Sequence, residues 1–123
     1  MSSMPSFKDM PIWQRSMRFA SEIYQLTAQL PATERLGVSN SLQQAAVALP
    51  TVLASGSLTG RDGFRSACLR GRQSAAEAET LLIIISQAYP AVPVDDLLAE
   101  VNDLQTALIG MAQRLNKQPP KSV

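Results

Sequence analysis

The sequence predicts an all-α protein, an antiparallel up-down four-helix bundle, on three observations. Apolar residues recur every three or four positions in four separate segments, as in helices that bury one face. Turns rich in proline or glycine separate these segments, and short turns favour antiparallel neighbours. No segment alternates polar and apolar residues as a half-buried strand does. The 123 residues suffice for one domain, so we expect a single bundle over 1–123, with flexible termini at about 1–10 and 117–123.

The first helix is predicted to begin at Pro11 and to end before Pro31. Proline suits the first helical position, because the N–H that it lacks would have no partner there. One row of apolar residues has helical spacing, and a second row lies beside it. The first row is Ile12, Phe19, Ile23, Leu26 and Leu30, and the second is Trp13, Met17, Ala20 and Tyr24. Because the helix is apolar over such a wide face, we expect it to contact two neighbours.

The second helix follows a turn at 31–37, in which Glu34 and Arg35 are expected to be exposed. Ser39 or Asn40 suits the N-cap, since their side chains can accept from free backbone N–H groups. The inward-facing residues expected are Leu42, Ala46, Leu49 and Leu53. Pro50 interrupts this row, and we predict a kink or break at 48–50, because proline removes a backbone donor and clashes with the preceding turn. The helix ends in the run 55–60.

The third helix, expected over 62–89, has the strongest periodicity of the chain. Its inward positions alternate spacings of four and three, and they are Phe64, Cys68, Gly71, Ala75, Ala78, Leu82, Ile85 and Tyr89. The small residues over 68–78 allow a partner helix to approach closely. We therefore expect this helix to be the central packing element.

The fourth helix follows the turn at 90–93 and shows the same spacing. Its inward positions are Leu97, Val101, Leu104, Leu108, Met111 and Leu115, and a polar tail begins at Lys117. No run of apolar residues approaches the roughly 20 that a membrane span needs. The first ten residues do not look like a secretory signal, and a single cysteine cannot staple a secreted fold, so a cytoplasmic location is expected.

Enzymatic activity is not expected. The chain has no histidine, so Cys68 lacks the usual base, and its place on the apolar row of the third helix favours a core residue. Metal-binding bundles use pairs of glutamate and histidine, whereas Glu77 and Glu79 point in different directions on a helix. Surface or inter-subunit ion pairs are the expected role of these two glutamates. No glycine-rich phosphate loop is present, and we predict no cofactor and no small-molecule substrate.

Several short motifs occur in order between about Phe7 and Leu115. They are Asp9 with Ile12, Trp13 and Gln14; Tyr24, Leu26 and Thr27 before Leu30 and Pro31; Glu34 and Arg35; Ala45, Ala46 and Pro50; Ala54 and Gly56; Phe64; and Ser74, Ala76, Glu77, Glu79 and Thr80. In this order the motifs resemble the four helix bundle protein family, also known as the 23S rRNA intervening-sequence proteins.

The resemblance implies a bundle that assembles into a ring, typically a pentamer. Some basic members of that family are accessory proteins of the reverse transcriptases of diversity-generating retroelements and bind nucleic acid. This chain has Gln43 and Gln44 where the family favours basic residues, and Val52 and Ser55 where it favours an Asn and a Glu. Gln73 replaces a glycine that usually precedes the serine of the third helix.

Two rows of charge are the candidate contact residues. The basic row is Arg61, Arg65 and Arg72, which share one side of the third helix, while Arg70 points elsewhere. The acidic row is Asp96, Glu100 and Asp103 on the fourth helix. The two rows are expected either to pair, within one bundle or between subunits, or to leave the arginines free for phosphates.

Two functions are therefore considered. The first is a non-enzymatic, ring-forming binding or scaffold module whose partner is itself, with no membrane partner. The alternative is a nucleic-acid-binding accessory protein that contacts RNA, DNA or a reverse transcriptase through the arginines. The net charge of only +1 weakens the alternative, because strong basicity is typical of nucleic-acid-binding domains.

Overall fold

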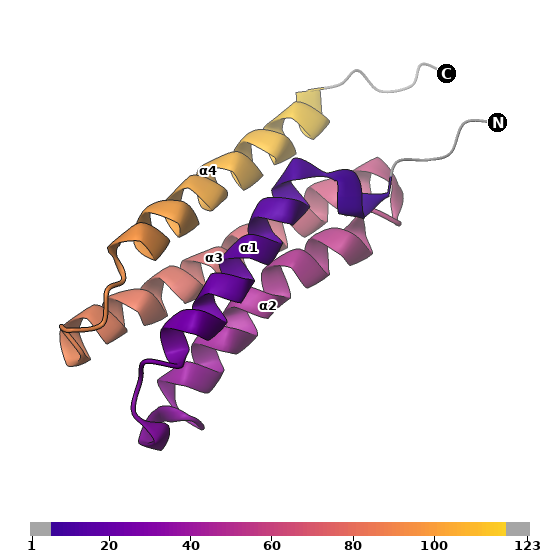
Figure 1. The fold of residues 1–123 in the computed structure, drawn as a ribbon. Coiled ribbons are helices and arrows are strands. Elements are labelled where there is room, and N and C mark those ends of the chain that lie inside the picture. Colours follow the sequence, from indigo (N-terminus) through magenta and orange to yellow (C-terminus); the bar gives the residue numbers. More distant parts are fainter. Residues whose placement is uncertain (1–5, 118–123) are drawn as a thin grey trace, which may run out of the picture.

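The computed structural model describes residues 6–117 and confirms the all-α prediction for this range. It contains four α-helices, α1 (Pro11–Thr27), α2 (Val38–Gly56), α3 (Gly60–Ala88) and α4 (Asp95–Lys117). Two short 3-10 helices, η1 (Phe7–Asp9) and η2 (Ala32–Glu34), precede α1 and α2 (Figure 1). The described range has no strand.

The four helices occupy the corners of one bundle. Each helix packs against the next one in the sequence, and α1 also packs against α4 (Figure 1). The diagonal pairs α1 with α3 and α2 with α4 do not touch backbone to backbone within the described range. The expected contact of the first helix with two neighbours is thus confirmed. Among residues 6–117, no helix is both long and apolar enough to cross a membrane.

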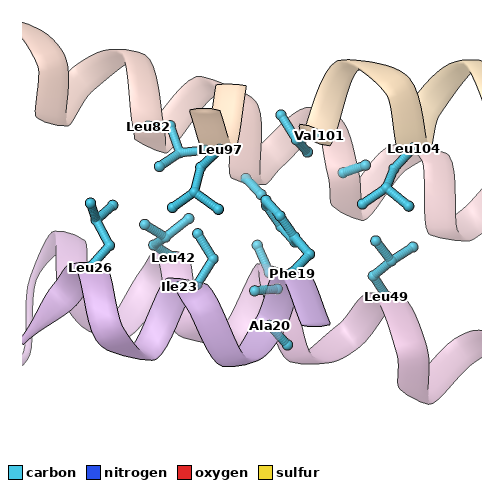
Figure 2. Close-up of a cluster of buried hydrophobic side chains, with 14 of the residues drawn as sticks. Phe19, Ala20, Ile23, Leu26, Leu42, Leu49, Leu82, Leu97, Val101 and Leu104 are labelled. Carbon is cyan, nitrogen blue, oxygen red and sulfur yellow. The ribbon is translucent and has the colours of Figure 1, made fainter. Parts of the chain in front are cut away.

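The core lies along the bundle axis and receives side chains from all four helices. Figure 2 shows Phe19 and Ile23 of α1 facing the apolar side chains of the other helices. The largest fully buried residues are Phe19, Ile23, Leu42, Leu49, Leu53, Leu82, Ile85, Val101, Leu104 and Leu108. Nearly all the predicted inward rows are buried here, so helical periodicity identified this core correctly.

The contact between α2 and α3 depends on glycine. A Cβ added at Gly56 would lie 2.2 Å from the Cβ of Ala67, and one at Gly71 would lie 3.0 Å from the Cδ1 of Leu49. Neither glycine has a positive φ. Both therefore matter because they let the α2 and α3 backbones approach closely, and not because of an unusual backbone conformation. The close approach that the sequence predicted for 68–78 therefore occurs, and it extends to the C-terminal end of α2.

The structure corrects two predictions about the second helix. The helix does not break at Pro50, because α2 is continuous from Val38 to Gly56, with Pro50 buried inside it. Proline removes one backbone hydrogen bond and can kink a helix without ending it, so only the break is excluded. Neither Ser39 nor Asn40 is the N-cap, since the cap position is Gly37 and Ser39 is buried in the first turn.

Glu34 was expected to be exposed and instead joins two parts of the bundle. Its Oε1 accepts a hydrogen bond from the backbone N–H of Val38 at 3.3 Å, and its Oε2 accepts one from the Tyr89 hydroxyl at 2.6 Å. A carboxylate is favourable at a helix N-terminus, where backbone N–H groups are free. Glu34 therefore replaces the missing cap of α2 and ties this end of the helix to the end of α3.

The expected flexible termini lie mostly outside the described residues. Within the stretch 1–10, η1 is formed, with the Ser6 hydroxyl accepting from the N–H of Lys8 at 3.2 Å. Phe7 packs edge-on against Trp13, with 5.3 Å between the ring centres. This contact fastens the start of the described chain to α1.

Candidate functional site

An open apolar groove runs along the outside of the bundle between α1 and α2. It has a volume of about 510 Å³. Its main lining residues are Trp13, Met17 and Tyr24 of α1 and Val47, Pro50 and Thr51 of α2. We call this surface the outer groove. It is almost wholly apolar, and its α1 side is built from the second apolar row of the first helix.

The outer groove exposes side chains that soluble surfaces usually hide. Met17 is 44% exposed, Tyr24 51% and Val47 40%. Within the second apolar row of α1, only Ala20 is fully buried, at 7% exposed. Clustered apolar side chains on a monomer surface typically mark an interaction site.

The side chains themselves explain why the groove stays open. Met17 and Tyr24 are large, and they face Val47 and Thr51 across the pair of helices. Glycine or alanine would allow the backbones to approach, as in the contact between α2 and α3. At the far end, Gln43 donates from Nε2 to the Thr27 Oγ1 at 2.9 Å, which fixes α1 to α2. This hydrogen bond is a neutral link between the two helices.

The basic row lies at the start of α3 and is not paired inside the bundle. Arg61 and Arg65 are half-buried, and Arg72 is exposed. The Nη2 of Arg61 and the Nε of Arg65 are shielded from solvent and have no acceptor in the described part of the chain. Leaving a charged donor buried without an acceptor is unfavourable, and these two shielded nitrogens are not themselves open to an external ligand.

The acidic row on α4 is split by a contact with α1. Glu100 accepts a hydrogen bond from the Nη2 of Arg15 at 3.1 Å and forms the one ion pair among the described residues. Both side chains are about one-third exposed, so the pair is worth no more than about 1 kcal/mol. Asp96 and Asp103 are exposed. Nothing in the sequence indicated that Arg15 would be the partner of Glu100.

The basic and acidic rows do not meet within one bundle. Gln105 donates from Nε2 to the Glu79 Oε1 at 2.8 Å, which sets α4 against α3. Arg65 lies 14 residues before Glu79, or about 21 Å along a helix at 1.5 Å per residue. Asp96 lies beyond this contact in the other direction, because Leu97 packs beside Leu82 (Figure 2). Among residues 6–117 the two rows thus form no ion pair with each other, and pairing between subunits stays a prediction.

Cys68 and the two glutamates of α3 do not form a reactive cluster in the described part of the chain. Burial raises the pKa of the Cys68 thiol to about 11, despite the opposing charge of Arg114, so the thiol is protonated at neutral pH. Protonated thiols are poor nucleophiles. Glu79 is engaged by Gln105, while Glu77 is exposed. In the described range, no three thiol or carboxylate groups gather where they could hold a metal ion.

Comparison with known proteins gives a family for this chain. The family model described as 23S rRNA-intervening sequence protein matches residues 8–110, which spans all of α1, α2 and α3 and most of α4. A search of the curated proteins found no match.

Proposed function

The chain belongs to the 23S rRNA-intervening sequence protein family, and from this premise we propose that it is a non-enzymatic binding or scaffold module that acts as a ring. In the family that this chain resembles, antiparallel up-down bundles assemble into a ring that is typically a pentamer. The assembly, rather than one subunit, then presents the functional surface.

The observation that carries this proposal is the outer groove. A single chain leaves Met17, Tyr24 and Val47 between 40% and 51% exposed on one continuous surface. Transferring such side chains out of water contributes about 25 cal/mol per Å² of apolar area, so covering the groove with a partner contributes favourably to association. A second copy of the chain is always available as that partner.

Light scattering on the purified protein tests this proposal. We expect a mass several times that of the 13.3 kDa chain at micromolar concentration, and five copies by native mass spectrometry. Because apolar contacts do not weaken with salt as ion pairs do, the mass should persist at high salt. A mass of one chain across this concentration range would contradict the proposal.

A second candidate function, binding of RNA, DNA or a reverse transcriptase, is favoured by one observation. None of Arg61, Arg65 and Arg72 forms an ion pair within the described range, and Arg72 is exposed. Phosphate oxygens are suitable acceptors for guanidinium groups. A ring would repeat the three arginines in every subunit and so widen the basic surface.

Fluorescence anisotropy with a labelled single-stranded RNA tests this second function. Replacing Arg61, Arg65 and Arg72 together by Gln should flatten the plot of log affinity against log salt. We expect its slope to fall by roughly one for each phosphate that an occupied subunit no longer binds. Arg70→Gln is the matched control, because Arg70 is an exposed arginine on another side of α3. Absence of RNA binding at low salt would exclude this function.

A further inference from the structure

The helix α2 has an unusual surface for a soluble protein. No charged residue occurs from Leu36 to Gly60, a stretch that contains all of α2. Exposed surfaces of small domains are usually about 25–35% charged, because charge keeps them apart in solution. The solvent-facing positions of α2 are instead small or neutral, and they are Ser41, Gln44, Val47, Thr51 and Ser55.

Two grooves flank this uncharged helix. The outer groove lies on the α1 side, and a second groove of about 590 Å³ lies on the α3 side. The second groove is lined by Gln44, Ala45 and Ala48 of α2 and by Glu77 and Leu81 of α3. Ile84, which is 45% exposed, lies one turn beyond Leu81 on the same side of α3. We call this surface the α3 ridge, after Glu77, Leu81 and Ile84.

We propose that the outer groove of one copy receives the α3 ridge of the next copy, so that α2 lies on the inside of the ring. This inference rests on the proposed ring. Tyr24 and Val47 of the groove then contact Ile84 of the neighbour, and apolar surface exposed on both sides is covered. The occupant is a second copy of this chain.

Charge complementarity supports this pairing. Arg18 is exposed on α1 about 60° around the helix from Ser21, which lines the outer groove, and Arg18 itself does not line it. Glu77 is exposed on the ridge. Neither has an ion-pair partner in the part of the chain that the structure describes. The α1 helix beside the groove and the ridge on α3 therefore have charges of opposite sign with no ion pair among the described residues.

The spacing of these residues also matches. Arg18 precedes Tyr24 by six residues on α1, and Glu77 precedes Ile84 by seven on α3. These separations correspond to about 9 and 10.5 Å along a helix. In an up-down bundle α1 and α3 run in the same direction, so these axial separations match when parallel neighbours lie side by side. Around α1, Arg18 lies about 120° from Tyr24, so its contact with Glu77 requires the long arginine side chain to extend around the helix.

The geometry of the bundle favours a closed ring. The two surfaces share the corner occupied by α2, so they face directions about 90° apart in a four-cornered bundle. A head-to-tail contact closes when the two faces are turned by about 90° to 120°, which suits about four to six copies, whereas opposite faces give open chains. The ring centre then lies on the α2 side, and α4 with Asp96 and Asp103 lies outside.

Complementation between two variants tests the inference. Tyr24→Glu disables the groove and Ile84→Glu disables the ridge, and both side chains are about half exposed, so the fold should survive. Each variant alone should show the mass of one chain in light scattering. An equal mixture should form a two-chain species, because one intact groove and one intact ridge remain. Ile83→Glu is the matched control, since Ile83 is 41% exposed on another side of α3, and it should keep the wild-type mass.

The outcomes separate the inference from the proposed ring. If the wild-type protein is monomeric, the ring itself is wrong. If it is oligomeric and Ile84→Glu keeps that mass, or the mixture does not complement, the groove-to-ridge contact is wrong while the ring stands.

A milder test concerns the charged residues. Arg18→Glu or Glu77→Lys should raise the concentration at which the oligomer dissociates by up to about fivefold per contact, and the double variant should bring that concentration back toward the wild-type value. An additive weakening in the double variant would overturn the proposed ion pair.

Discussion

The two sides of α2 differ in how closely they meet their neighbours. Toward α3, Gly56 and Gly71 leave little room for a side chain, and the two helices pack closely at these positions. Toward α1, Val47 and Thr51 face Met17 and Tyr24 across an open groove. Both sides are apolar, so hydrophobicity alone does not explain the difference.

Side-chain size explains it. Small residues let two backbones approach until little apolar surface stays in water, whereas large ones hold the helices apart and remain partly exposed. The close contacts at Gly56 and Gly71 stabilise the fold, and the outer groove keeps apolar side chains available for a partner. Substitutions on the two sides should therefore have different effects.

The largest effect on the free energy of unfolding is expected on the buried side of α2. Leu49→Ala removes a fully buried side chain and should lower the free energy of unfolding by about 2–5 kcal/mol in urea titrations. Val47→Ala, two residues away in the outer groove, should change it by about 0.5 kcal/mol or less under conditions where the protein is dissociated. Equal losses in the two variants would show that the groove belongs to the core.

The next effect concerns the close contact of α2 and α3. Gly56→Ala places a methyl group against Ala67, so we expect the free energy of unfolding to fall by about 1–3 kcal/mol in thermal or urea unfolding. Gly110→Ala on α4 is the matched control, because only the Arg114 side chain lies nearby, at 3.6 Å. That change should stabilise the protein by about 0.5–1 kcal/mol, since alanine favours a helix over glycine. A neutral Gly56→Ala would refute the close contact.

A smaller, spectroscopic effect reports on the groove. Trp13 is the only tryptophan and lines the outer groove, so its fluorescence should shift to longer wavelength when dilution dissociates the oligomer. Tyr24→Glu should show the shifted emission at every concentration, because its groove is not covered. Emission that is independent of concentration in an oligomeric wild type would place the subunit contact elsewhere.

The smallest effect is the pH dependence at the end of α3. The hydrogen bond that Tyr89 donates to Glu34 raises the pKa of the Tyr89 hydroxyl above its usual value of 10.0. The unfolded chain therefore ionises first as pH rises, so this contribution to stability is present below about pH 10 and disappears above it. Urea unfolding at about pH 8 and pH 11 should show a smaller decrease in stability for Tyr89→Phe than for the wild type. Equal decreases would mean that the bond does not stabilise the fold.

Much of the fold could be predicted from the sequence because helical periodicity is a local property. The spacing of Cys68, Gly71 and Ala75 marks the buried side of α3 without any knowledge of its neighbours. The role of Glu34 could not be predicted, since Tyr89 lies 55 residues away and meets it only after the bundle forms. That α2 continues through Pro50 could not be predicted for a related reason, because whether a proline ends a helix depends on its tertiary surroundings.

The candidate sites were predicted in part. The sequence identified the basic and acidic rows, but the partner of Glu100 is Arg15, which is 85 residues away. It also identified the second apolar row of α1, of which Met17 and Tyr24 are exposed in one chain.

The sequence by itself determined four helices and the side that each one buries, because these follow from the order of apolar residues along the chain. Only the tertiary structure decided at which positions two helices pack closely and at which they leave a groove, because that depends on side chains from distant segments meeting across the bundle. Gly56 against Ala67 closes one contact, and Met17 beside Val47 leaves the other open.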